Sequence, residues 1–168
     1  MADFPPGVVI TEVRVAGADL EAVRDLLHEY GRSDAVQSSA QDYDGELAAL
    51  PGVYASPGGC LWLARLGGMP AGCVALRGLD AKRCEMKRLY VRAAFRGAGL
   101  AGILIDGVIA RARVLGYDEL YLDTLLEMRA ARLIYEMLGF RACAPYLPDP
   151  TPGAECLVLN LTGSPAEW

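Results

Sequence analysis

The sequence predicts a single α+β domain in which a mixed, mostly antiparallel sheet is flanked by about four helices. Its 168 residues suit one domain. The first half carries short apolar runs joined by tight turns, which is typical of strands that pair antiparallel with their neighbours. The second half alternates helical and extended patterns. Because no linker, repeat or low-complexity segment divides the chain, residues 1–168 are predicted to form one domain.

The first elements are a strand and two helices. Residues 8–15, VVITEVRV, are rich in β-branched side chains and predict a strand. Asp19 is expected to cap a helix that ends at Gly31. A capping box formed by Ser38 and Gln41 predicts a short second helix.

A β-hairpin and a third strand follow. The runs 60–66 and 71–77 flank a turn that contains two adjacent glycines. Residues 84–91, CEMKRLYV, predict the next strand. This part of the chain is therefore expected to be an antiparallel meander.

The second half begins with a helix over 99–115 and a strand over 119–124. A further helix is predicted over 127–138, where a glycine ends the pattern. Two closing strands are predicted at 140–144 and 155–161, separated by a proline-rich loop.

Charge and hydropathy exclude some classes of partner. The net charge of −5 argues against a nucleic-acid partner, which usually requires a basic face. The first ten residues lack the pattern of a secretory signal, and no run of about eighteen apolar residues occurs. The sequence therefore predicts a cytoplasmic protein that does not enter a membrane.

The cysteine and histidine content predicts no metal site. His28 is the single histidine, and no cluster has the spacing of zinc ligands. The number of cysteines is odd and none forms a C-x-x-C pair, so they are expected to be reduced and structural. The five cysteines are Cys60, Cys73, Cys84, Cys143 and Cys156.

A glycine-rich turn, FRGAGLAGIL (95–104), is the clearest functional signal. It contains G-x-G-x-x-G from Gly97 and R-x-x-G-x-A from Arg96. A turn that opens a helix presents backbone N–H groups without intrahelical partners, and the helix dipole is positive there. The turn is therefore predicted to bind phosphate. The alternative is a plain strand-to-helix turn, which would show the same glycine pattern.

A nicotinamide-binding site is one alternative for this turn, with Asp123 in the place of the ribose-binding acid. Two features count against it. Five residues separate the preceding strand from Gly97, whereas a dinucleotide fold usually runs its strand directly into the first glycine. That strand is also charged at Glu85, Lys87 and Arg88, unlike a central parallel strand.

Three motifs occur together between residues 84 and 140: a strand that ends in LYV (89–91), the R-x-x-G-x-A turn, and Y-x-x-x-G-F from Tyr135. This combination resembles the GCN5-related N-acetyltransferase (GNAT) superfamily, and the order of elements agrees over essentially the whole chain. The resemblance implies a three-layer fold whose sheet is splayed between the strands at 84–91 and 119–124. It also implies acetyl-CoA (coenzyme A) as cofactor, with its pyrophosphate on the glycine-rich turn.

The resemblance implies two catalytic residues. Glu85 would be the general base, the alternatives being a solvated charge or an ion pair with Arg83 or Lys87. Tyr135 would protonate the leaving thiolate, the alternative being a half-buried packing residue. A backbone N–H near Leu89 would polarise the thioester carbonyl. The implied cofactor contacts are Leu89, Tyr90, Val91, Arg96, Gly97, Ala98, Gly99, Leu100, Ala101, Gly102, Ala131 and Tyr135.

The acceptor is expected between residues 27–45 and 144–153, as in this family. Aromatic and acidic side chains there would form a pocket for a cationic amine, the alternative being a surface or a dimer contact. Met128 departs from the family, which often has Asn at this position for a cofactor contact. The candidate acceptor residues are Tyr30, Tyr43 and Tyr146, with Asp42 and Asp44.

The predicted function is acetyl-CoA-dependent N-acetyl transfer to a primary amine of a small molecule or peptide, by direct transfer and without a metal. A nonenzymatic acyl-CoA-binding or regulatory module on the same fold is the alternative, and an NAD-dependent oxidoreductase is a weaker one. A homodimer is also expected, because dimers are common in the family.

Overall fold

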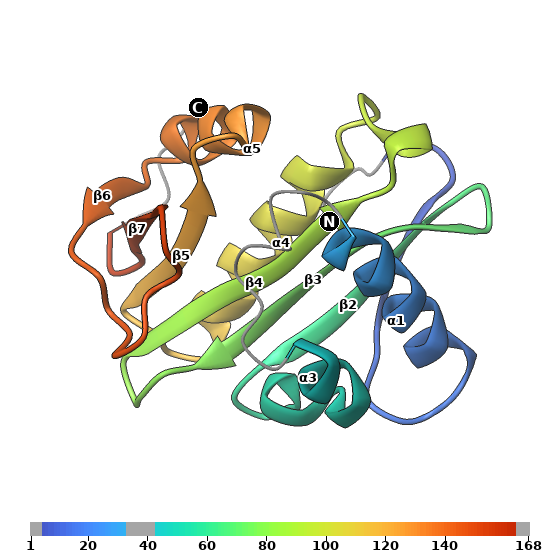
Figure 1. Cartoon of the computed structure of the whole chain (residues 1–168), viewed down its shortest axis with the longest axis horizontal. Helices are drawn as coiled ribbons and strands as arrows, with labels where there is room; N and C mark the ends of the chain where they lie inside the picture. Colours follow the sequence, from blue (N-terminus) through green and yellow to red (C-terminus); the bar gives the residue numbers. More distant parts are fainter. Residues whose placement is uncertain (1–4, 33–42, 164–168) are drawn as a thin grey trace.

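The computed structural model describes residues 5–32 and 43–163. One seven-stranded sheet has the order β1-β2-β3-β4-β5-β7-β6 (Figure 1). All neighbouring strands are antiparallel except β4 and β5, which are parallel. This confirms the predicted fold class. The strands are β1 (Val8–Glu12), β2 (Cys60–Leu66), β3 (Met69–Gly78), β4 (Arg83–Val91), β5 (Glu119–Leu125), β6 (Arg141–Cys143) and β7 (Ala154–Asn160).

Helices cover both faces of this sheet. In Figure 1, α1 and α3 lie in front of the sheet, and α4 lies behind it. The α-helices of the described residues are α1 (Ala18–Gly31), α3 (Tyr43–Ala49), α4 (Leu100–Val114) and α5 (Arg129–Met137). Two 3₁₀ turns lie at Gly52–Tyr54 and Ala93–Phe95.

The alternation of side chains on β3 divides the apolar core into two clusters. Cys73 and Ala75 pack with α1 and α3, whereas Val74 and Leu76 pack with α4. Successive residues of a strand point to opposite faces of a sheet, so an apolar run such as this one is buried from both sides. The helix α5 joins the α4 cluster through Tyr135.

The most important feature of the sheet is the short pairing between β4 and β5. Only three residues of each strand are in register, and the last pair is Glu85 with Tyr121. Beyond it, β5 continues beside β7 and β4 continues beside β3. The predicted splay between these strands is therefore confirmed, and Figure 1 shows the two ribbons diverging.

A bulge distorts β4 beyond this point. Cys73 of β3 faces Tyr90, whereas Ala75 faces Lys87, so two residues of β4 oppose one of β3. Arg88 lies in this bulge with φ of 60°, a left-handed conformation that side chains with a Cβ rarely adopt. The bulge re-aims the Arg88 side chain.

Some predicted details were wrong. Asp19 does not cap α1, because the helix begins after Gly17 with no side-chain capping bond. Asp19 lies in the first turn instead, where its charge suits the helix dipole, and it accepts a bond of 2.7 Å from Arg65. The first strand ends at Glu12 rather than at residue 15. The capping box at residues 38–41 lies outside the described residues.

The structure also bears on the membrane, cysteine and metal predictions. None of the helices in the described part of the chain has the length and apolarity needed to cross a bilayer. All five cysteines are free, and all but Cys143 are buried. The described residues contain no group of three metal-binding side chains.

Close packing of α4 against β2 predicts an unusual response to a glycine substitution. A Cβ at Gly107 would lie 2.6 Å from the Trp62 ring, whereas a Cβ at Gly102 of the same helix would meet nothing within 4 Å. Alanine normally favours a helix over glycine by about 1 kcal/mol. At Gly107 the clash should outweigh this gain, and we expect Gly107→Ala to lower the free energy of unfolding by about 1–3 kcal/mol.

Urea denaturation of Gly107→Ala and of the control Gly102→Ala measures this difference. The control should be neutral or slightly stabilising. Equal stability of the two variants would contradict the described packing of Trp62 on α4.

Candidate active site

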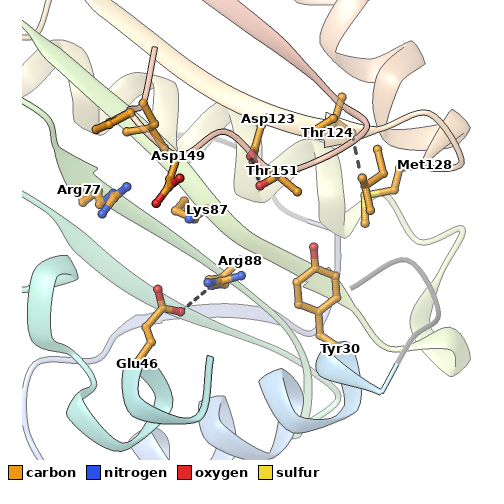
Figure 2. Close-up of a pocket in the computed structure, with 14 residues that line it drawn as sticks. Tyr30, Glu46, Arg77, Lys87, Arg88, Asp123, Thr124, Met128, Asp149 and Thr151 are labelled. Carbon is orange, nitrogen blue, oxygen red and sulfur yellow. Dashed lines mark hydrogen bonds and ion pairs between the residues drawn. The ribbon is translucent and has the colours of Figure 1, made fainter. Parts of the chain in front are cut away.

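Two adjoining cavities open where β4 and β5 diverge. The larger has a volume of about 310 Å³ and is bordered by α1, α3, the strands β3 to β5, and the loop before β7 (Figure 2). The smaller has a volume of about 80 Å³ and reaches α5. Residues that line both mark the junction between them, and these are Tyr30, Lys87, Arg88, Asp123, Thr124 and Met128.

An ion pair between α3 and β4 forms one wall of the larger cavity. Arg88 Nε donates to Glu46 Oε2 at 2.6 Å, and the Tyr54 hydroxyl donates to Glu46 Oε1 at 2.7 Å. The Arg88 guanidinium also lies 4.7 Å from the centre of the Tyr43 ring. Burial raises the pKa of Glu46, but the bonds from Arg88 and Tyr54 outweigh it, so the pKa is lowered. These contacts hold the Arg88 side chain in place although its backbone has an unusual φ.

Glu85 lies in a buried network beneath this cavity. Its side chain is fully buried, and it accepts bonds from Arg77 Nε at 2.8 Å and from the Tyr146 hydroxyl at 2.6 Å. Lys87 Nζ is 4.0 Å away. Of the two ion pairs considered as alternatives for Glu85, the pair with Lys87 is therefore present, whereas Arg83 bonds to an acid in its own turn. Glu85 is thus an ion-pair partner that lines neither of the two cavities.

Asp123 is the carboxylate at the junction of the cavities. It accepts a bond of 2.7 Å from the Thr151 hydroxyl. After burial, its negative charge is one of the causes that raise the pKa of three surrounding phenols, those of Tyr30, Tyr135 and Tyr146. Asp123 therefore lies among the three phenols that border the site.

Tyr135 of α5 lines the smaller cavity together with Leu89 and Ala131. Only 5% of its surface is exposed, and its ring packs 5.5 Å from that of Phe140. Burial raises the pKa of the Tyr135 phenol above its ordinary value, so the hydroxyl stays protonated at neutral pH. A protonated phenol in this position can donate a proton into the cavity. At the start of α5, Met128 lines both cavities, and its Sδ accepts a contact of 3.9 Å from the Thr124 hydroxyl.

The glycine-rich turn lies between β4 and α4. Gly97 and Gly99 have φ of 86° and 80°, and Gly99 caps α4. Among the described residues, the N–H groups of residues 97–102 donate to no partner. A Cβ on any of the three glycines of this turn would meet nothing within 4 Å. Arg96 uses Nε to bond to the Val91 carbonyl at 3.0 Å, which leaves its terminal nitrogens at the turn. Open space above free N–H groups and a cation fits a pyrophosphate.

The end of β4 supplies a backbone edge between the turn and the cavities. From Met86 onward, the side of β4 that faces β5 pairs with no strand in the described part of the chain. Tyr90 turns its ring toward α1, 5.5 Å from that of Tyr30, so its backbone is the part available to a ligand. An unpaired strand edge can bond an extended chain.

The predicted acceptor residues are not all together. Tyr30 lines both cavities. Tyr43 packs between α1 and Arg88, and its hydroxyl donates to the Leu27 carbonyl. Tyr146 is bound to Glu85. Asp42 lies outside the described residues, and Asp44 is exposed.

Sequence reasoning missed several residues of the larger cavity, because they come from four separate segments of the chain. Asp123 was considered as a ribose-binding acid, and its position at the end of a splayed strand was the available signal. The pairing of Arg77 with Glu85 depends on the register of β3 and β4, which no local pattern reveals. The missed lining residues are Glu46, Arg77, Lys87, Asp149 and Thr151.

Fold and site together define a class: an acyl-CoA-dependent transferase with a splayed sheet and a glycine-rich turn that opens α4. The family model of the Acetyltransferase (GNAT) family matches residues 20–140. An uncharacterized N-acetyltransferase of Schizosaccharomyces pombe is 33% identical over 160 residues, which cover 94% of this chain and 98% of the relative. The chain therefore belongs to the GNAT acetyltransferase family, and it is an acyltransferase with acetyl-CoA as co-substrate.

Other comparisons agree in fold. An acetyltransferase from Streptococcus agalactiae has a TM-score of 0.80 at 20% identity, covering 92% of this chain and 99% of that one. A Salmonella typhimurium acetyltransferase solved with its cofactor acetyl-CoA has a TM-score of 0.69 at 20% identity, covering 95% and 98%. Human N-acetylaspartate synthetase is 40% identical over 86 residues, which are 51% of this chain and 28% of that protein.

The Glu46–Arg88 pair predicts a pH-dependent contribution to stability. At pH 7, Glu46→Gln should lower the free energy of unfolding by about 1–3 kcal/mol, because it leaves a largely buried guanidinium without its anion. The folded-state pKa of Glu46 is lowered, so its stabilising effect is present above the unfolded pKa and is lost as the pH falls through the folded one. The difference from wild type should therefore narrow between pH 7 and about pH 3.

Urea denaturation at both pH values tests this, with Asp44→Asn as the control because it removes an exposed acid from the same helix. A destabilisation by Glu46→Gln that stays constant with pH would exclude the ion pair as its cause.

Proposed function

We propose that this protein transfers the acetyl group of acetyl-CoA directly to a primary amine. The observation that carries this proposal is the meeting of two cavities at the splay, with the open N–H groups of the turn at one end of β4 and Tyr135 beside the smaller cavity. Acetyl-CoA would enter from the turn, and the acceptor would occupy the larger cavity.

The residues of the turn and the strand would hold acetyl-CoA. The N–H groups from Gly97 to Gly102 and the Arg96 guanidinium would bind the pyrophosphate. The backbone edge of Leu89, Tyr90 and Val91 would pair with the pantetheine arm, which passes Ala131 on α5. The N–H of Leu89, which lies in the bulge, would polarise the thioester carbonyl.

Direct transfer requires two proton transfers. The acceptor ammonium must lose a proton before its nitrogen attacks the thioester carbon, and the departing sulfur must gain one as the C–S bond breaks. Tyr135 is proposed as the acid, since its phenol lines the smaller cavity and stays protonated.

Two carboxylates are proposed as candidates for the general base. Glu85, the sequence-based candidate, is buried, so it would receive the proton through the Tyr146 hydroxyl that is bonded to it. Asp123 faces the junction directly. Glu85 therefore remains one proposed base, and Asp123 is the other.

The acceptor remains a small-molecule or peptide amine. The relatives named N-acetylaspartate synthetase make an amino acid one candidate, which the charges of the larger cavity support. Family membership disfavours the nicotinamide alternative. A cytoplasmic location and a homodimer are retained as proposals from the sequence, and the free cysteines agree with a reducing compartment.

Binding of acetyl-CoA is the first test. Calorimetric titration should show one saturable site for acetyl-CoA and none for NADH. Arg96→Gln should weaken the binding of CoA by about tenfold, the scale of a charged hydrogen bond. It should leave the binding of pantetheine, which lacks the pyrophosphate, unchanged. Preference for NADH, or equal losses for both ligands, would contradict the proposed site.

Turnover of an amine separates the enzyme from a nonenzymatic acyl-CoA-binding module. Tyr135→Phe should lower kcat at least tenfold and leave the affinity for acetyl-CoA within about twofold, because the ring keeps its packing. The control Tyr117→Phe removes a hydroxyl that is bonded to the Gly58 carbonyl, outside both cavities. Unchanged turnover in Tyr135→Phe would refute the acid role.

Glu85→Gln in the same assay distinguishes the two routes for the base. A loss of rate concentrated at low pH supports Glu85 as the proton acceptor. A loss that is uniform over pH assigns to Glu85 the structural role of holding Arg77, and leaves Asp123 as the base.

A further inference from the structure

The charged side chains of the larger cavity differ in whether they are already paired. Arg88 is bound to Glu46. Arg77 bonds to Glu85 through Nε alone, and its two terminal nitrogens make no hydrogen bond to any described residue. The Lys87 ammonium is 4.0 Å from Glu85, beyond hydrogen-bond distance, and 22% of its side chain is exposed. Both cations are paired with Glu85, but the terminal nitrogens of Arg77 and the ammonium of Lys87 make no hydrogen bond to a described residue and so present donors to this cavity.

Of these two donors, Arg77 lies away from the reacting end, whereas Lys87 lies at the junction of the cavities. Arg77 lines only the larger cavity, whereas Asp123 lines both, and Tyr135 lines only the smaller one. Figure 2 shows Arg77 and Lys87 toward one end, Tyr30 and Met128 at the other, and Asp123 between them. An acceptor that reaches the junction with its amine thus extends past Lys87 and has Arg77 at its far end.

The remaining acid of this region does not cancel these cations. Asp149 lies near Lys87 in Figure 2, but it is exposed on the loop before β7 and forms no bond or ion pair with the described residues. An exposed carboxylate remains solvated and interacts weakly with its neighbours. The carboxylate of a substrate that the cavity encloses can therefore interact with Arg77 and Lys87 in place of Asp149.

We propose that the acceptor is an amino acid with a free carboxylate, bound by Arg77 and Lys87, while Asp123 holds its ammonium group at the junction of the cavities. The inference rests on the proposed acetyl transfer and names its substrate class. A guanidinium and an ammonium are strong donors to a carboxylate. The volume of about 310 Å³ is at the low end for small-molecule pockets, which suits an acceptor of this size. A polyamine, by contrast, would place a second cation against Arg77 and Lys87.

The test compares L-alanine with L-alaninamide, which differ in the carboxylate alone, and adds an acidic amino acid and a polyamine. The rate of CoA release is measured with L-aspartate, L-alanine, L-alaninamide and spermidine. Wild type should favour the amino acids over L-alaninamide and spermidine. Lys87→Met should lower kcat/KM for the amino acids by about 10- to 100-fold, the scale of a charged hydrogen bond, and change that for L-alaninamide less than about threefold. Asp123→Asn should impair all acceptors, because each carries the ammonium.

Lys82→Met is the matched control, since Lys82 is exposed, pairs with Asp118 and lines neither cavity. It should behave as wild type. The inference is overturned if spermidine or L-alaninamide is preferred, or if Lys87→Met impairs L-alanine and L-alaninamide equally; the proposed function stands in both cases. Calorimetric binding of L-aspartate to the protein–CoA complex gives a second readout that needs no turnover. Failure to bind acetyl-CoA would instead overturn the proposed function.

Discussion

The divergence of β4 and β5 is the constraint on which the rest of the site depends. Each strand keeps one fully paired edge, β4 with β3 and β5 with β7, but the edges that face one another pair over three residues only. Backbone groups that are buried without a partner cost free energy, so a sheet does not leave such a gap unless water or a ligand fills it. The binding edge is thus a property of the strand pairing, and the cavities follow from it.

Charge pairing then decides what this gap can hold. Glu85 can be completely buried as an anion because Arg77 and Tyr146 both donate to it. Glu46 is held in the same way by Arg88 and Tyr54. These bonds engage both carboxylates and the Nε groups of Arg77 and Arg88, and the Arg88 guanidinium also packs against the Tyr43 ring. The donors that face the cavity are those that remain, at Arg77 and Lys87.

The sequence predicted the fold and the geometry of the glycine-rich turn better than the lining of the larger cavity, for a physical reason. Elements longer than five residues have a period that a local window reveals, and the turn at Gly97 and Gly99 requires left-handed backbone conformations that glycine adopts at little cost. The Arg77–Glu85 pair instead depends on the register across a bulged pair of strands. Asp19 shows that local rules also place the start of a helix imprecisely. An acid in the first turn interacts favourably with the helix dipole whether or not it caps the helix.

The two parts of the site therefore differ in the kind of chemistry that builds them. The proposed pyrophosphate site at the glycine-rich turn consists of N–H groups, which every residue but proline carries, so its requirements are small residues and a helix that starts in the right place. The larger cavity, proposed for the acceptor, is lined by side chains from several elements, and its selectivity would depend on how their charges are paired. A single exchange at Lys87 or Arg77 can alter that balance without touching the turn or the unpaired edge of β4. The fold can consequently keep one co-substrate while it accommodates different amines, and the acceptor must be inferred from the particular charges of each chain.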